Sequence, residues 1–315
     1  MRVIEHLDRA KEPLISFEII PPRRGGDLKS LLGLIDDLVA HRPPFIDITS
    51  HPAVLSYEEG PDGIRKVIKR KRPGTLGVCA LIQHKYNVDA VPHVLCRGFT
   101  REETEDFLIE LHYLGIDNVL IIRGDDNGYM KPVKEGRTAN RFAVDLVSQV
   151  GDMNQGQFLE PYLQALPTNF CVGVAGYPEK HMEAANLDMD VRRLREKVEA
   201  GADYIVTQMF FENAHYFRFV EKCRDHGITV PIIPGLKVMT VKKHLTSLPR
   251  IFNCEIPTAL ADEVETADKD KILEIGAEWT ANQAQELLDS GVPSVHFYVM
   301  QSSKAINKVL KRLKR

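Results

Sequence analysis

A carboxylate stands inside a segment that otherwise has the composition of a buried strand. The segment is LISFEIIPP, residues 14–22; six of its first seven residues are apolar or small, and the exception is Glu18. Burial disfavours the ionised form of a carboxyl and raises its pKa, so a sheltered glutamate suits proton donation near neutral pH. Glu18 is therefore a candidate general acid, and the alternative is a structural carboxylate satisfied by an arginine.

Polar residues also end the other predicted strands. Ser16 and Glu18 share one face of the first strand, because side chains alternate between its faces. The later strand ends carry Asp47, Thr49, Ser50, His93, Arg123, Gly124, Asp125, Tyr177, His181, Gln208, His296 and Tyr298. In an α/β barrel the active site lies at the C-terminal ends of the strands. We therefore expect polar groups from at least six strands to meet at one mouth.

Apolar runs of strand length alternate with helical patterns along the chain. We expect strands at 14–20, 45–50, 90–96, 118–124, 170–176, 204–210, 230–234 and 294–300. We expect helices near 27–40, 75–87, 100–114, 140–150, 187–200, 213–226, 240–248, 267–290 and 302–313. The apolar residues of 75–87 would also suit a strand, but its polar HKYN ending is typical of a helix C-terminus.

Glycines mark the return from helix to strand. Gly115, Gly201, Gly227 and Gly291 each follow a predicted helix and precede an apolar strand by two or three residues. Alternating strands and helices predict parallel pairing with right-handed crossovers. Eight such units in 315 residues predict an α/β protein with one domain, folded as a single (β/α)8 TIM barrel. A doubly wound sheet is the alternative, but the GxGxxG motif is absent after the first strand.

The bulk composition narrows the classes of partner and compartment. With 43% hydrophobic residues, 27% charged residues and a formal net charge of −3, the chain shows no signature of a nucleic-acid or anionic-membrane partner. No signal peptide and no membrane span is expected. The five cysteines are scattered without a CxxC pair, which indicates neither a zinc site nor a disulfide framework. We expect a cytoplasmic protein with reduced thiols and no bound metal.

The predicted helix at 187–200 carries a stripe of charge. Asp190, Arg193 and Lys197 lie at positions i, i+3 and i+7, which places them on one face. One interpretation is a solvent-exposed helix with internal salt bridges. The other is a helix that offers donors to an anionic ligand such as a pyrophosphate.

Segments along nearly the whole chain resemble, in the same order, the methylenetetrahydrofolate reductase family. They are SFEIIPP, FIDITSHP, PHVLCRGFTREE, LGIDNVLIIRGD, VAGYPEKH, AGADYIVTQMFF, IIPGLKVM and HFYVM. Three positions depart from the family pattern, with Leu95, Phe142 and Ser302 in place of more polar residues. The ordered set is specific to this family, and it agrees with the predicted barrel.

The resemblance implies that residues 1–315 form a single FAD-binding catalytic domain. It would take hydride from NADH or NADPH and reduce 5,10-methylenetetrahydrofolate to 5-methyltetrahydrofolate, which feeds methionine synthesis. By motif, Glu18 would be the general acid, and Asp125 and Gln208 would contact the folate. The FAD site would include Thr49, His93, Arg123, Gly124, Asp125, Ala143, Tyr177, His181, Asp190, Arg193 and Lys197. Bacterial members often form homo-oligomers, and no motif here decides the matter.

A second reading keeps the barrel without a flavin. It is a lyase or aldolase that acts on a small anionic substrate through a Schiff-base lysine or a metal cluster. Lys237 is the lysine found at a predicted strand end, and no set of metal ligands stands out in the sequence. A binding protein that uses the barrel as a scaffold is a third reading, which the polar mouth disfavours.

Overall fold

The computed structural model describes residues 1–61, 63–124, 131–161 and 165–314. The main sheet contains β1 (Leu14–Ile19), β2 (Phe45–Ile48), β5 (Asp89–Leu95), β6 (Asn118–Ile122), β7 (Cys171–Gly176), β8 (Tyr204–Thr207), β9 (Ile232–Ile233), β10 (Gly235–Leu236) and β11 (Ser294–Met300). The helices are α1 (Val3–Arg9), α2 (Leu28–Val39), α3 (Leu76–Tyr86), α4 (Arg101–Tyr113), α5 (Ala143–Asn154), α6 (Leu187–Glu199), α7 (Asn213–Asp225), α8 (His244–Phe252), α9 (Thr258–Thr266), α10 (Ile272–Asp289) and α11 (Lys304–Leu310). A separate antiparallel hairpin consists of β3 (Val54–Gly60) and β4 (Gly63–Lys69).

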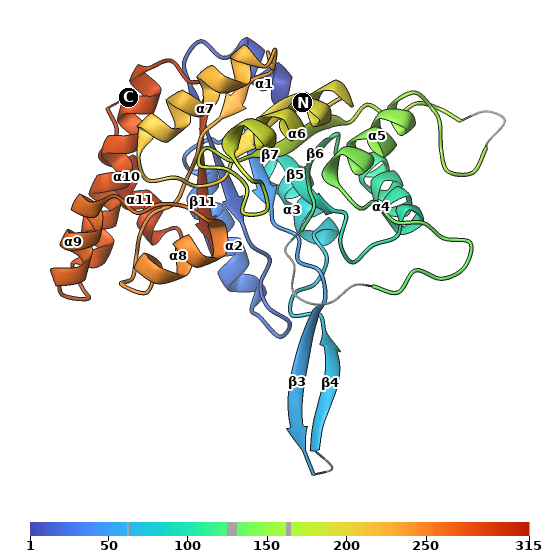
Figure 1. The fold of residues 1–315 in the computed structure, drawn as a ribbon, viewed down its shortest axis with the longest axis horizontal. Coiled ribbons are helices and arrows are strands. Elements are labelled where there is room, and N and C mark those ends of the chain that lie inside the picture. The colour runs from blue at the N-terminus through green and yellow to red at the C-terminus, as the bar shows by residue number, and fades with distance from the viewer. Residues whose placement is uncertain (62, 125–130, 162–164, 315) are drawn as a thin grey trace.

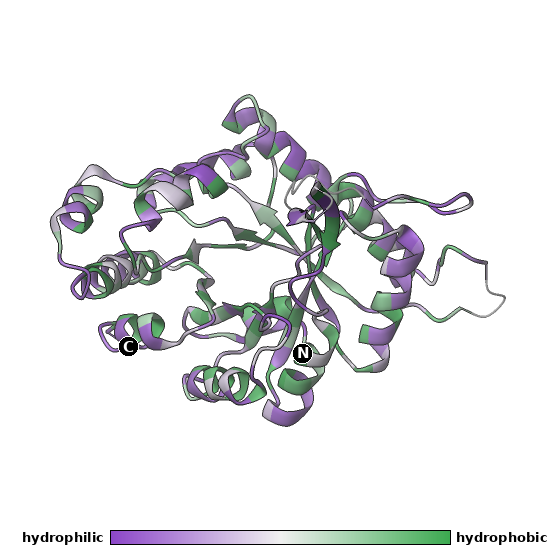
Figure 2. Ribbon diagram, turned by 90° about the horizontal axis from the view of Figure 1, so that it is seen from below, coloured by the Kyte–Doolittle hydropathy of each residue, from purple (hydrophilic) through white to green (hydrophobic). Residues whose placement is uncertain are grey.

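The main sheet curls into a nearly closed barrel. Its strand order is β10-β11-β1-β2-β5-β6-β7-β8-β9, and the neighbouring strands pair in parallel. β9 and β10 come from one extended segment that Pro234 interrupts, because proline lacks the N–H that a strand ladder uses. Within the described ranges, nine strands therefore fill eight positions, and helices surround them (Figures 1 and 2). The predicted (β/α)8 barrel is confirmed.

Alternation along β1 sorts its side chains between the helices and the barrel interior. Ile15, Phe17 and Ile19 are buried in the large core cluster that also holds the apolar residues of the surrounding helices. Ser16 and Glu18 occupy the opposite face, as the two-residue period predicts. The face of β1 that points inward is therefore polar, while the face that anchors it is apolar.

The N-terminal end of the barrel interior is closed by apolar residues. A separate buried cluster consists of Val3, Phe45, Val91, Leu120, Cys171, Tyr204, Val206 and Ile233. Ile4 and Leu7 of α1 pack against this cluster, so α1 covers that end of the barrel. Polar groups inside the barrel can reach a ligand only from the other end, at the C-terminal ends of the strands, which we call the barrel mouth.

Most predicted elements are present, including the helix at 75–87, which is α3 and ends at Asn87 with a left-handed φ of 52°. The sequence prediction missed α1, α9 and the β3–β4 hairpin, and it placed α8 at 240–248 rather than 244–252. The hairpin was missed because its strands are largely exposed and lack the buried positions that mark a core strand. Figure 1 shows the hairpin projecting from the barrel. Its apolar residues Tyr57, Ile64 and Ile68 are exposed. No described helix has the length and hydrophobicity to cross a membrane.

One close approach between a helix and a loop gives a test of this packing. A Cβ added to Gly276 of α10 would lie 1.8 Å from the carbonyl oxygen of Met239, in the loop after β10. Gly276→Ala must displace backbone, and we expect it to lower the free energy of unfolding by roughly 1–3 kcal/mol. Gly33 of α2 is exposed and has no atom within 4 Å of the added Cβ.

The matched variant Gly33→Ala should raise the free energy of unfolding by about 0.5–1 kcal/mol, since alanine is the better helix former. Urea unfolding followed by circular dichroism measures both variants. Equal stability of the two variants would show that α10 does not pack against the loop after β10 in this way.

Candidate functional site

Glu18 lies inside the barrel, near the mouth, and is 7% exposed. The Thr49 hydroxyl, just after β2, donates a 2.6 Å hydrogen bond to Glu18 Oε1. On the other side, Glu18 Oε2 lies 3.5 Å from His93 Nε2 of β5 and 3.9 Å from His296 Nε2 of β11. The structure thus brings together residues from four strand ends, as the sequence predicted. We call Glu18, Asp47, His93 and His296 the buried charge cluster.

The expected direction of the Glu18 pKa is wrong. Burial alone would raise the pKa, as the sequence argument assumed. The charges of His93 and His296 and the hydrogen bond from Thr49 outweigh burial and lower the pKa to about 2. The sequence does not reveal this, because His93 and His296 are far from Glu18 along the chain.

His93 connects Glu18 to a second buried carboxylate. His93 Nε2 lies 3.8 Å from Asp47 Oδ2, and Asp47 has no exposed surface. Burial alone would lower the pKa of His93, but the charges of Glu18 and Asp47 raise it above its usual value. Neither oxygen of Asp47 and neither ring nitrogen of His93 has a hydrogen-bond partner among the described residues. His296 is held differently, by a 2.8 Å hydrogen bond between its Nδ1 and Ser16 Oγ.

A second group of predicted residues meets at the loop between β7 and α6. The His181 backbone N–H donates a 2.7 Å hydrogen bond to Asp190 Oδ2, and the His181 ring packs edge-on against Tyr177 at 4.7 Å between centroids. Burial lowers the pKa of His181 and raises that of Asp190. Arg123, after β6, forms an ion pair with Glu183 in the same loop. These residues supply an aromatic surface with cations and donors around it.

The predicted stripe on α6 is divided between two environments. Lys197 points inward, where its Nζ donates a 2.8 Å hydrogen bond to the carbonyl of Ala175. Burial lowers the Lys197 pKa to about 8, with the charge of Asp190 acting in the opposite direction. The Arg193 side chain is 72% exposed and pairs with Glu196 at 2.9 Å. The structure therefore brings Asp190 and Lys197 together and leaves Arg193 on the outer surface of α6.

The remaining predicted residues are placed as follows. Gly124 has a φ of +88°, a backbone conformation that residues with a side chain rarely adopt. A Cβ added at this position would contact Leu95 and Arg97. Ala143 begins α5. Gln208, after β8, accepts a hydrogen bond at Oε1 from its neighbour Met209, which leaves its NH₂ group as a donor. Asp125 lies outside the described residues.

Lys237 follows β10, and its charge interacts with that of Glu18. The sequence analysis named Lys237 only as a candidate for a Schiff-base reaction. Its Nζ donates a 2.9 Å hydrogen bond to the carbonyl of Tyr298 on β11. Burial lowers the Lys237 pKa to about 8, and the charge of Glu18 opposes that shift. A cation therefore stands at the mouth on the opposite side of Glu18 from Asp47.

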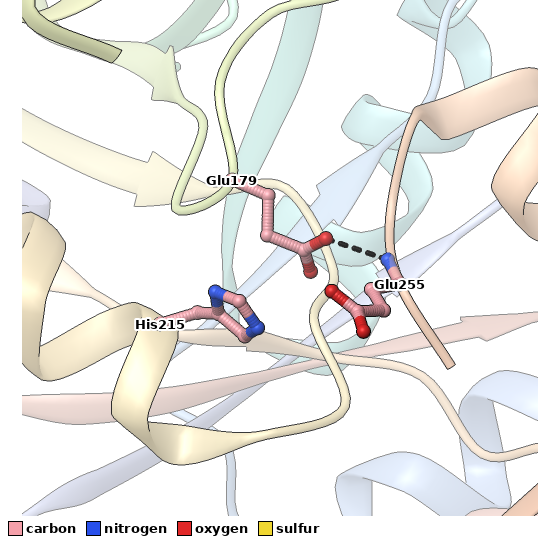
Figure 3. A group of neighbouring side chains, drawn as sticks. All are labelled: Glu179, His215 and Glu255. Carbon is pink, nitrogen blue, oxygen red and sulfur yellow. Dashed lines mark hydrogen bonds between the residues drawn. The ribbon is translucent and has the colours of Figure 1, made fainter. Parts of the chain in front are cut away.

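A cavity of about 480 Å³ lies outside the barrel interior, between the β7–α6 loop, α7 and the residues after α8. Glu179, His215 and Glu255 line it, with donor atoms within 4.8 Å of one another (Figure 3). Glu179 accepts a hydrogen bond from the backbone N–H of Glu255, and burial raises its pKa to about 7. Arg218 lies 2.7 Å from His215 Nδ1 and already brings a positive charge to the group. The sequence analysis missed this group because its members come from the β7–α6 loop, helix α7 and the segment after α8, which are far apart along the chain.

Comparison with known proteins gives the following relatives. The family model described as methylenetetrahydrofolate reductase matches residues 2–314. The chain is 30% identical over 316 residues to methylenetetrahydrofolate reductase 1 of Schizosaccharomyces pombe, covering 98% of this chain and 47% of that protein. It is 28% identical over 295 residues to the 5,10-methylenetetrahydrofolate reductase of Pectobacterium carotovorum, covering 92% and 86%. The chain spans about half the length of the first curated relatives it matches.

Solved structures support the same fold. A Clostridium thermocellum protein, described as binding two copies of 5-methyl-5,6,7,8-tetrahydrofolic acid, gives a TM-score of 0.63 at 13% identity and covers 98% of this chain and 97% of its own. A 2,3-dimethylmalate lyase gives 0.51 at 8% identity, covering 98% and 81%. At these identities the likeness shows the fold alone. Because the family model spans nearly the whole sequence, the chain belongs to the methylenetetrahydrofolate reductase family.

Proposed function

We propose that this chain is an FAD-dependent reductase that converts 5,10-methylenetetrahydrofolate to 5-methyltetrahydrofolate with NADH or NADPH. The observation that carries the proposal is Glu18, a buried carboxylate at the barrel mouth between a hydroxyl and two imidazoles. Bacterial relatives named 5,10-methylenetetrahydrofolate reductase support the substrate. The Clostridium thermocellum neighbour, which binds a methylated folate, supports a folate site in this fold.

The residues near Tyr177 and His181 suit a flavin dinucleotide. The half-buried Lys197 ammonium has three donors, of which one bonds the carbonyl of Ala175, and Arg123 adds a second cation for a diphosphate. His93 Nδ1 is buried and has no hydrogen-bond partner among the described residues, so it can bond a ligand. Bound FAD would supply hydride transfer from the nicotinamide to the folate methylene carbon.

The chain's own residues would prepare the folate for that transfer. A closed methylenetetrahydrofolate ring accepts hydride poorly, and protonation of a ring nitrogen opens it to an electrophilic iminium. Glu18 would give that proton from Oε2, because Thr49 holds Oε1. Gln208 would bond the pterin through its NH₂ group, and Asp125 would contact it as the family resemblance implies. The closed N-terminal end leaves the mouth as the entrance for both substrates.

We further propose the setting in which the protein works. Residues 1–315 would act as one catalytic domain in the cytoplasm and supply methyl groups for methionine synthesis. Size-exclusion chromatography with light scattering measures whether copies associate into homo-oligomers.

The spectrum of the purified protein tests the proposed function. We expect a yellow protein with a flavin spectrum that NADH or NADPH bleaches under anaerobic conditions and that methylenetetrahydrofolate then restores. A colourless protein that does not take up added FAD would contradict the proposal. That result would favour the lyase or aldolase reading, for which Lys237, with its pKa lowered to about 8, is the Schiff-base candidate. Reduction with borohydride in the presence of a carbonyl substrate would then trap it.

Glu18→Gln separates the two half-reactions. The amide keeps the shape of the side chain but cannot donate an acidic proton. We expect NAD(P)H to reduce the bound flavin at the wild-type rate, while reoxidation by methylenetetrahydrofolate slows by roughly 10²–10⁴-fold. Anaerobic stopped-flow absorbance measures each step. Unchanged reoxidation would remove Glu18 from the chemistry.

Lys197→Met tests the flavin site. The substitution keeps much of the aliphatic stem and removes the half-buried charge, so we expect FAD to bind about 10–100-fold more weakly, the effect of one charge-assisted hydrogen bond. The control is Arg195→Met on the same helix, because Arg195 is exposed and pairs with Glu199. Quenching of flavin fluorescence during titration of the apoprotein gives both dissociation constants. Equal values would place the diphosphate elsewhere.

A further inference from the structure

Asp47 is a charged residue inside the barrel to which the proposed mechanism gives no role. It has no exposed surface, and no described residue donates a hydrogen bond to either of its carboxylate oxygens. A buried carboxylate is stable only when a nearby charge or a bound proton compensates it. The compensating group in reach is His93, whose Nε2 lies 3.8 Å from Asp47 Oδ2. Asp47 is therefore placed to stabilise His93 as an imidazolium.

The same imidazole nitrogen faces the proposed general acid. His93 Nε2 lies 3.5 Å from Glu18 Oε2, so one nitrogen stands between two carboxylates that come from β1 and β2. Ser16 fixes His296 on the other side of Glu18, and Thr49 fixes Glu18 Oε1. The geometry leaves Oε2 as the atom of Glu18 that exchanges a proton with His93.

This arrangement resolves a difficulty in the proposed mechanism. A general acid must carry a proton, yet the surroundings of Glu18 favour its carboxylate, with a pKa of about 2. The pKa of His93 is shifted in the other direction by the two carboxylates. When Glu18 and His93 share one proton, that proton therefore resides on His93 and not on Glu18.

We propose that Asp47 and His93 store the proton that Glu18 delivers to the folate, with Asp47 as the positioning residue that keeps His93 charged. This rests on the proposed function. When a ligand covers the mouth, Glu18 loses its remaining contact with water, and this disfavours its ionised form. The His93 Nε2–H bond then breaks as the Glu18 Oε2–H bond forms. Glu18 next loses that proton to the folate ring nitrogen, and His93 regains one from water after product release.

Other charged and titratable groups also face this chain of residues. The Lys237 ammonium and His296 favour the Glu18 carboxylate, which keeps the proton on His93 until a ligand binds. Three other titratable groups lie near Asp47, namely Cys79 of α3, Tyr204 of β8 and Tyr298 of β11. Burial, and to a smaller extent the charge of Asp47, raises the pKa of each. These three stay neutral at the pH of the reaction, so they supply no charge that could replace Asp47.

The experiment is a titration of histidines by NMR in Asp47→Asn, which keeps the shape of the side chain and removes its charge. With histidine labelled at Cε1, the His93 signal is assigned from its loss in His93→Gln. In the wild-type protein we expect His93 to titrate above the ordinary value of about 6.5. Asp47→Asn should shift its protonation equilibrium about tenfold toward the neutral form, which is about one pKa unit.

A matched control is Asp89→Asn. Asp89 lies on β5, the strand that carries His93, but pairs with His6 at the N-terminal end of the barrel, at 2.7 Å. It should leave the His93 titration unchanged. A His93 signal that titrates alike in wild type and Asp47→Asn would overturn the proposal. If Asp47→Asn fails to fold, a wild-type His93 that titrates at or below 6.5 would overturn it equally.

The pH profile of the folate half-reaction gives a second readout. Reoxidation should fail as pH rises through the pKa of His93, because the stored proton is then lost. Asp47→Asn lowers that pKa, so its rate should fall at a pH about one unit lower, while flavin reduction by NAD(P)H keeps its wild-type profile. If the wild-type protein reduces no folate but Asp47→Asn still shifts His93, the proposed function fails and the charge pairing stands. If folate is reduced and neither readout changes, the pairing fails alone.

Discussion

The cost of placing charge inside a barrel governs this structure. Glu18 and Asp47 are carboxylates in an interior that close packing would otherwise fill with aliphatic side chains. Each lies near His93, and Glu18 also faces His296 and the Thr49 hydroxyl. Removing one of these partners would leave an uncompensated charge, so the groups depend on one another. The strands that carry them must keep their relative register for the arrangement to persist.

The barrel meets this demand by dividing its interior into two parts. The N-terminal part is a dry apolar cluster that α1 covers, and it contributes packing. The part toward the mouth holds the buried charge cluster, with Lys237 and Tyr298 beside it. The apolar cluster keeps water away from the N-terminal side of the buried charge cluster. The charges therefore interact in a medium of lower polarity, where each neighbouring charge has a larger electrostatic effect.

Much of this arrangement could be predicted from the sequence, and the limit has a physical origin. The two-residue period fixes which face of a strand a side chain occupies, so Ser16 and Glu18 were correctly placed on the inner face of β1. The rule that barrel sites lie at strand ends predicted that Thr49, His93 and Glu18 would meet at the mouth, and the structure places them together. Periodicity says nothing of distances between separate strands, so the link from His93 to Asp47 and the reversed pKa of Glu18 were not predictable. Arg193 shows the same limit, since a shared helical stripe does not fix which residue turns inward.

The interruption at Pro234 has a consequence for where the barrel opens locally. β9 and β10 have two residues each, so the seam that joins β8 to β11 contains fewer backbone hydrogen bonds than the longer ladders on the far side. Transient opening begins where the fewest such bonds must break. Amide protons that bond across this seam should therefore exchange with solvent sooner than those that bond across the longer β1–β11 ladder, and the part of the barrel wall that opens first is the one that carries Lys237.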